Sequence, residues 1–179
     1  MPMIDAFIPE GALESKAETR LFKEITDILL RLEGLDPANQ KARDVTVIFL
    51  HRPSVLVAGS PTEMPRYRFI VSVPEGQYDD ESRKAVVKEV TDAVARAEGG
   101  TFDEVGPRVW VFPVEIADGS WGSRGVIRPL PAILAYLVGE HERPAAEAKL
   151  ANRRRDKAVA ILDAAREVAV SDQYGVPSL

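Results

Sequence analysis

Residues 9–34, PEGALESKAETRLFKEITDILLRLEG, are matched 65 positions later by residues 74–99, PEGQYDDESRKAVVKEVTDAVARAEG. Ten of the 26 aligned positions are identical, and no gap is needed. Both segments open with Pro-Glu-Gly and end at a glycine, a common helix stop. Their apolar residues recur with the i, i+4, i+7, i+8 spacing of a helix that buries one face. Self-similarity of this density indicates a duplicated unit.

Each copy of the unit predicts a strand, a helix and a second strand. Apolar runs before the two turns predict strands at 4–8 and 68–73, and the stripes predict helices near 14–33 and 79–98. Further strands are predicted at 45–50 and 109–114. We expect the helix residues that face the sheet to be buried, namely Leu21, Ile25, Ile28, Leu29, Val86, Val90 and Val94.

The order of these elements predicts the fold class. A strand, a crossover helix and a second strand form a βαβ unit, whose strands are parallel and whose connection is right-handed. We therefore expect an α/β fold in which two tandem βαβ units form one four-stranded mixed sheet with two helices on one face. The alternative is a ferredoxin-like sandwich, which is also a doubled βαβ pattern.

The rest of the chain divides around the two units. Residues 51–66 contain three prolines and Gly59, and predict a loop with a short strand at 55–58. A glycine-rich turn follows at 118–125, and residues 144 to about 170 have a helical pattern with a basic, solvated face at 153–155. We assign 1–66 to the first unit and its loop, 67–140 to the second unit of the same domain, and 141–179 to a C-terminal helical extension.

The composition limits the function classes. The 179 residues are 45% hydrophobic and 28% charged, which suits a globular domain. We find no apolar run long enough to cross a membrane and no signal peptide, so we expect a cytoplasmic protein. The chain has no cysteine and two histidines, which argues against disulfides and against a histidine-rich metal site. A net charge of −5 argues against general nucleic-acid binding.

Pro2 is the candidate catalytic residue. It stands directly behind Met1 and ahead of the first predicted strand. Removal of Met1 would leave Pro2 with a free secondary amine held in the body of the protein. A free α-amine has a pKa of roughly 7.7–8.0, which burial or nearby cations such as Arg52 or Arg124 would lower. The neutral amine can remove a proton next to a carbonyl, and the protonated amine can act as a general acid.

Three features together resemble the tautomerase superfamily: the tandem βαβ units, the proline before the first strand, and the segment EIADGSWGSRG at 115–125. The family includes oxalocrotonate tautomerase, macrophage migration inhibitory factor and malonate semialdehyde decarboxylase, and it uses the amino-terminal proline as its catalytic group. The resemblance implies that Trp121 lines the substrate pocket. His51-Arg52-Pro53 is similar to a segment of the decarboxylase branch. The likeness covers about residues 2–130 and leaves the C-terminal helix outside.

The chain departs from the family pattern at the arginines that hold a substrate carboxylate. Short tautomerases have an arginine directly after the Glu-Gly turn, where this chain has Ala12 and Gln77. Other residues must therefore bind the substrate. Arginine offers a fork of donors to a carboxylate, histidine can transfer a proton near neutral pH, and tyrosine offers a hydroxyl. The candidates, each of which also has an ordinary packing or surface explanation, are Arg124, Trp121, His51, Arg52, Tyr67 and Arg108.

The resemblance implies a cofactor-independent isomerase, a tautomerase that uses Pro2 as general base or acid on a small unsaturated or keto acid. A related decarboxylase or hydratase is one alternative. A non-catalytic trimeric binding or scaffold protein that kept the fold is another. In the family, three chains assemble into a barrel, and an open sheet face needs a cover. We therefore expect a homotrimer with no metal, nucleic-acid or membrane partner.

Overall fold

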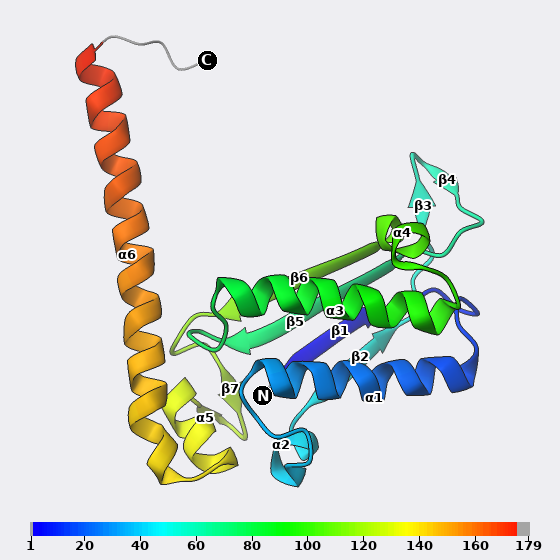
Figure 1. Ribbon diagram of the computed structural model, residues 1–179, viewed down its shortest axis with the longest axis horizontal. Helices are drawn as coiled ribbons and strands as arrows, with labels where there is room; N and C mark the ends of the chain where they lie inside the picture. The colour runs from blue at the N-terminus through cyan, green and yellow to red at the C-terminus, as the bar shows by residue number, and fades with distance from the viewer. Residues whose placement is uncertain (1, 175–179) are drawn as a thin grey trace.

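The structure is a computed structural model that describes residues 2–174, so whether Met1 is removed is a question that lies outside the described residues. Four strands form one mixed sheet in the order β2-β1-β5-β6 (Figure 1). The strands are β1 (Met3–Phe7), β2 (Val47–His51), β5 (Tyr67–Pro74) and β6 (Val109–Ile116). β1 is parallel to β2, β5 is parallel to β6, and β1 and β5 pair antiparallel. The predicted sheet of two βαβ units is confirmed.

The two long helices, α1 (Ser15–Leu32) and α3 (Asp80–Glu98), lie side by side on one face of the sheet (Figure 1). The predicted stripes are confirmed, because their seven residues are at most 8% exposed. They pack with the inward side chains of β1 and β5 into one core, to which the sheet contributes Ile4, Ala6, Phe69 and Val71 among others.

The contacts between the helices repeat the duplication seen in the sequence. Arg31 of α1 pairs with Glu89 of α3, and Arg96 of α3 pairs with Glu24 of α1. A shift of 65 residues converts one ion pair into the other. The two units are therefore related by an approximate two-fold arrangement in space as well as by sequence.

A small hairpin follows the second strand of each unit, and the two hairpins also correspond. The first consists of β3 (Leu56–Val57) and β4 (Ser60–Pro61), so the short strand predicted at 55–58 is present. The second consists of β7 (Gly122–Ser123) and β8 (Val126–Ile127). Both turns have two residues of positive φ, Ala58-Gly59 and Arg124-Gly125, which is the geometry of a type I′ turn.

Several short helical elements complete the body of the protein. α2 (Gln40–Asp44) precedes β2, and α4 (Phe102–Val105) with a 3₁₀ turn at Gly106–Arg108 precedes β6. No helix was predicted at 130–137, where the structure has α5 (Leu130–Leu137) with Pro129 and Pro131 at its start. Proline is tolerated in the first turn of a helix, where its missing N–H has no intrahelical partner.

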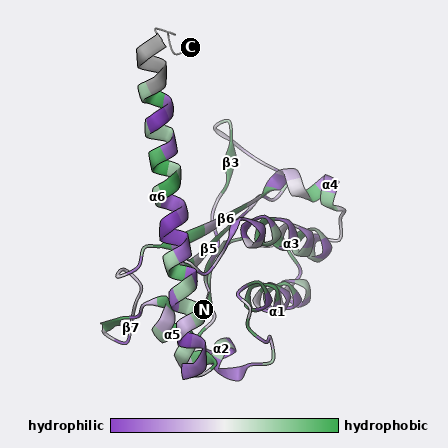
Figure 2. Ribbon diagram, turned by 60° about the vertical axis from the view of Figure 1, so that its left-hand side comes forward, coloured by the Kyte–Doolittle hydropathy of each residue, from purple (hydrophilic) through white to green (hydrophobic). Residues whose placement is uncertain are grey.

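The C-terminal helix α6 (Arg143–Tyr174) follows a 3₁₀ turn at Glu140–Glu142 and projects away from the body (Figure 1). Its first part packs on α5 and buries Leu150, whereas Ile161, Leu162 and Val168 stay exposed. Figure 2 shows hydrophobic and hydrophilic residues alternating along the projecting part. Within residues 2–174, no helix is both long and apolar enough to span a membrane.

Candidate functional site at the start of the first strand

Pro2 is buried directly before β1, at the end of the sheet where α1 finishes (Figure 1). Its neighbour Met3 packs against a second apolar cluster, which contains Leu30 of α1 and Trp121. Pro2 and Trp121 therefore lie at the same end of the sheet, as the predicted site requires. Trp121 is only 5% exposed and packs in the core, so stacking of its ring on a substrate stays a prediction.

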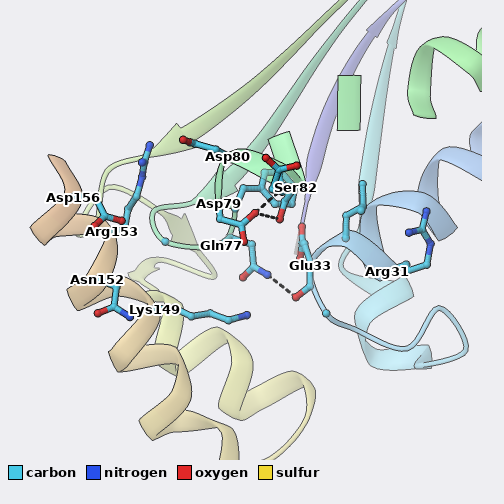
Figure 3. A pocket seen from close by; sticks show the side chains of 15 residues that line it. Arg31, Glu33, Gln77, Asp79, Asp80, Ser82, Lys149, Asn152, Arg153 and Asp156 are labelled. Carbon is cyan, nitrogen blue, oxygen red and sulfur yellow. Dashed lines mark hydrogen bonds between the residues drawn. The ribbon is translucent and has the colours of Figure 1, made fainter. Parts of the chain in front are cut away.

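A groove of about 810 Å³ opens at this end, between the end of α1, the loop before α3, and α6 (Figure 3). Glu33, Gln77 and Tyr78 line it, and all three are at least nine-tenths buried. The Gln77 side-chain N–H donates to the Glu33 carbonyl oxygen at 2.8 Å. In the described part of the chain, neither Gln77 Oε1 nor the Tyr78 hydroxyl has a hydrogen-bond partner. The groove therefore offers polar groups to a ligand.

The electrostatics of the groove centre on Glu33. Burial raises the pKa of its carboxyl, while the positive charge of Lys149 acts to lower it. Burial, followed by the charge of Glu33, raises the pKa of Tyr78. Figure 3 shows the Lys149 side chain extending from α6 toward Glu33 and Gln77. A buried carboxyl at the end of α1 thus lies near Tyr78, which precedes α3, and near a cation of α6.

Ion pairs hold α6 in place beside this groove. Arg153 bonds Glu115 at 2.8 Å, and Arg154 bonds Asp118 at 2.6 Å. Lys157 pairs with Glu75, and this contact is the main reason why the pKa of the Glu75 carboxyl is lowered. The basic segment at 153–155 is therefore not simply solvated, because two of its three arginines bind acidic groups, Glu115 at the end of β6 and Asp118 just after it.

Two of the predicted site residues, His51 and Arg52, lie at the opposite end of the sheet. His51 Nε2 lies 2.7 Å from Asp5 Oδ1, and the imidazole ring stacks on Phe7 with centroids 4.3 Å apart. Arg52 binds Glu18 through two hydrogen bonds of 2.7 Å each. Both side chains are thus tied to the end of β1 that is remote from Pro2.

Tyr67 and Arg108 also lie at that opposite end. Arg108 donates to Glu98 at 2.5 and 3.1 Å and to the Pro65 carbonyl at 2.7 Å. Tyr67 is fully buried, and its pKa is raised by burial and by Glu98. Met3 pairs with Ser72, five residues beyond Tyr67 on β5, which separates Tyr67 from the start of β1 by about 16 Å at roughly 3.3 Å per residue.

Arg124 occupies the tip of the β7–β8 hairpin. It is exposed and lines a small pocket of about 100 Å³ together with Val45 and Tyr136. It does not line the larger groove, so its predicted contact with a substrate stays a prediction. Among residues 2–174, no group of three or more His, Cys, Asp or Glu side chains could hold a metal ion.

Sequence reasoning missed Glu33, Tyr78 and Lys149 as candidate functional residues. Glu33 was visible as one of the ten repeated identities, matched to Glu98. Both copies of the unit have a glutamate at the end of the apolar helix stripe, where an apolar side chain would be expected. This repeated carboxylate could have indicated a functional residue. Lys149 gave no signal, because only the packing of α6 brings it to the groove.

The comparisons with known proteins concern the fold. No model of a protein family matches the sequence, and no curated protein matches it. Among solved structures, a fused 4-OT described as a symmetric trimer matches with a TM-score of 0.57 and 20% identity over 74% of this chain and 98% of its own. The chain has the fold of the tautomerase superfamily.

Other neighbours with this tautomerase fold agree. Pt0534, solved after inactivation by 2-oxo-3-pentynoate, matches with a TM-score of 0.56 and 20% identity over 70% of this chain and 94% of its own. The macrophage migration inhibitory factor of Toxoplasma gondii matches with a TM-score of 0.54 and 10% identity over 70% and 99%. The likeness of His51-Arg52-Pro53 to the decarboxylase branch stays a prediction.

Proposed function

We propose that the protein is a cofactor-independent tautomerase-like enzyme in which the Pro2 amine acts as general base or acid on a small unsaturated or keto acid. The observation that carries the proposal is the position of Pro2, buried at the start of the first strand of a tautomerase fold. The groove at the same end is lined by acidic and basic residues, and its cations Lys149 and Arg153 are the groups there that we expect to bind a small acid. Several structural neighbours are described as fused 4-OT, and this likeness supports the same reaction class.

The test is a screen of enol- and keto-acids, comparing the wild-type chain with Pro2→Ala. We expect the substitution to abolish activity, because alanine supplies a primary amine of different basicity and geometry. Intact-protein mass shows whether Met1 has been removed, which the proposal requires. A wild-type chain that keeps Met1, or a Pro2→Ala variant with full activity, would refute the role of Pro2.

We further propose that the working form is a homotrimer. The sheet face opposite the helices leaves three large side chains about half exposed, Phe49, Trp110 and Phe112, at 46%, 44% and 44%. Some fused 4-OT neighbours are described as trimers. Burial of this face between copies would also bring His51, Arg52, Tyr67 and Arg108 of one chain closer to its neighbours. A monomeric mass in ultracentrifugation at micromolar concentration would exclude the trimer.

Two other functions are consistent with the fold. A decarboxylase or hydratase would use Pro2 as an acid, and His51-Arg52-Pro53 favours that branch. A non-catalytic trimeric scaffold would explain why Ala12 and Gln77 stand where the family has arginines. Retained Met1 together with a trimeric mass would favour the scaffold.

A further inference from the structure

The duplication provides an internal reference for the groove beside Pro2. A shift of 65 residues places Pro2 on Tyr67 and Glu33 on Glu98. In the second unit, Glu98 at the end of α3 lies beside Tyr67 at the start of β5, close enough to raise the pKa of the tyrosine. Because the two units share the same strand–helix geometry, Glu33 at the end of α1 stands in the same relation to Pro2 at the start of β1.

The two carboxylates differ in the cation that accompanies them. Glu98 binds the guanidinium of Arg108 through two hydrogen bonds, at 2.5 and 3.1 Å. The strand registers pair Met3 with Val47 and Arg68 with Trp110, so the equivalent of Arg108 in the first unit is Val45. An apolar residue thus stands where the second unit has its arginine. Glu33 nevertheless remains a carboxyl, and it is only 2% exposed.

A buried carboxylate is costly unless a cation accompanies it. Lys149 on α6 is one cation that acts on Glu33. Removal of Met1 would supply a second, the Pro2 amine at the start of β1. The third titratable group that faces it is Tyr78, before α3. Lys149 is exposed to solvent, whereas Pro2 is buried. Once Met1 has been removed, the Pro2 amine at the start of β1 is therefore the better-placed counterpart of Arg108.

We propose that Glu33 is the counter-ion of the Pro2 ammonium group, and that Pro2 consequently enters the reaction as a proton donor. The inference rests on the proposed function, in which Pro2 carries the free amine, and it makes Glu33 a positioning residue. An anion beside an amine favours its charged form and raises its pKa, whereas a cation such as Lys149 opposes this. The two groups then titrate as a coupled pair. Such a site favours substrates that accept a proton at carbon, such as enols and unsaturated acids.

The experiment measures the Pro2 amine directly, without substrate. The full chain, with Pro2 confirmed by mass as its first residue, is labelled with ¹⁵N-proline, and the Pro2 nitrogen is titrated by NMR. We expect Glu33→Gln to lower the pKa of the Pro2 amine by at least about one unit, since an opposite charge at close range shifts a pKa by about 1–3 units. Glu98→Gln, the matched change in the second unit, should leave the Pro2 pKa unchanged, and Glu89→Gln on the surface serves as a second control.

Lys149→Ala is an independent test at an exposed side chain, and it should change the Pro2 pKa in the opposite direction. It should raise the pKa of the Pro2 amine, because the cation that competes for Glu33 has been removed. The inference is overturned if the pKa of the Pro2 amine is unchanged in Glu33→Gln. If that variant does not fold, an unchanged or lowered Pro2 pKa in Lys149→Ala overturns it instead. A shift in both variants with no activity on any acid would retain the counter-ion and reject the enzyme. Activity that depends on Pro2, with no change of the Pro2 pKa in either variant, would retain the enzyme and reject the counter-ion.

Discussion

In the second βαβ unit, the carboxylate that ends the helix, Glu98, is bound by Arg108 beside the buried Tyr67. In the first unit, Val45 takes the place of that arginine, and the cation that acts on Glu33 is Lys149 of α6. The same backbone position therefore serves two purposes. The second unit closes its cluster with partners from its own strands, while the first leaves its carboxylate next to a groove.

The difference shows how a duplicated fold can acquire one site instead of two. A chain has only one amino terminus, so the nitrogen at the start of β5 is an ordinary peptide nitrogen. Once Tyr67 fills that position, its hydroxyl, Glu98 and Arg108 can be buried together as a structural cluster. The helical extension α6, which brings Lys149 to the first unit only, adds to the asymmetry.

The largest effect should come from removing the arginine that distinguishes the two clusters. Arg108→Ala leaves the Glu98 carboxylate buried beside Tyr67 without its guanidinium. Loss of one partner of a buried pair typically destabilises a protein by about 3–5 kcal/mol. Chemical denaturation should show this loss for Arg108→Ala and less than about 1 kcal/mol for Lys84→Ala or Arg31→Ala at the surface. A loss below about 1 kcal/mol for Arg108→Ala would mean that the second cluster is not structural.

Substitutions at equivalent core positions of the two units should differ less in the folding free energy that they cost. Ile25 and Val90 correspond by the 65-residue shift, and both are fully buried against the sheet. Ile25→Ala should cost about 2–5 kcal/mol of folding free energy. Val90→Ala should cost less, because it removes one methylene group fewer. The two denaturation midpoints, compared with wild type, test the ranking, and a change under about 0.5 kcal/mol for Ile25→Ala would place it in the usual range of surface sites.

The repeat made most of the fold predictable. Once residues 9–34 and 74–99 are aligned, periodicity gives the helices, the buried stripes and the strands that flank them. α5 was missed because two prolines at its start resemble a break when no packing information is available. The tail was predicted as a helix, but sequence alone does not show that α6 projects from the body. The apolar residues of a helix have the same spacing whether or not another element covers the face that they form.

The candidate site was less predictable than the fold. The position of Pro2 follows from its place before the first strand. The residues around it come from the end of α1, the loop before α3 and α6, and only tertiary packing brings these segments together. His51, Arg52, Tyr67 and Arg108 were chosen by residue type, and within one chain they lie at the other end of the sheet. A repeated buried glutamate would have been a better indicator than a lone arginine.

The corresponding hairpins allow a third test of the asymmetry. Arg124-Gly125 in the second hairpin stands where the first has Ala58-Gly59, so only one hairpin carries a guanidinium. If Arg124 holds a substrate anion, Arg124→Ala should lower kcat/KM by at least roughly tenfold, equivalent to about 1.4 kcal/mol. Arg124→Lys should restore part of the activity through its charge. If Arg124→Ala keeps full activity, the exposed hairpin tip plays no part and the anion is bound elsewhere, with Lys149 the next candidate.

The smallest effect, and the most direct test of the symmetry, concerns the two ion pairs between α1 and α3. Arg31–Glu89 and Arg96–Glu24 are interchanged by the duplication, and each lies on the solvent side of the helix pair. Exposed ion pairs contribute about 0.2–1 kcal/mol in double-mutant cycles. Two cycles, each built from two alanine substitutions and their combination, should give coupling energies in this range that agree with each other and fall together as salt is added. If one pair couples and the other does not, the two-fold relation between the helices is looser than the sequence repeat implies. The contrast between the units would then extend from their ends into the helix interface itself.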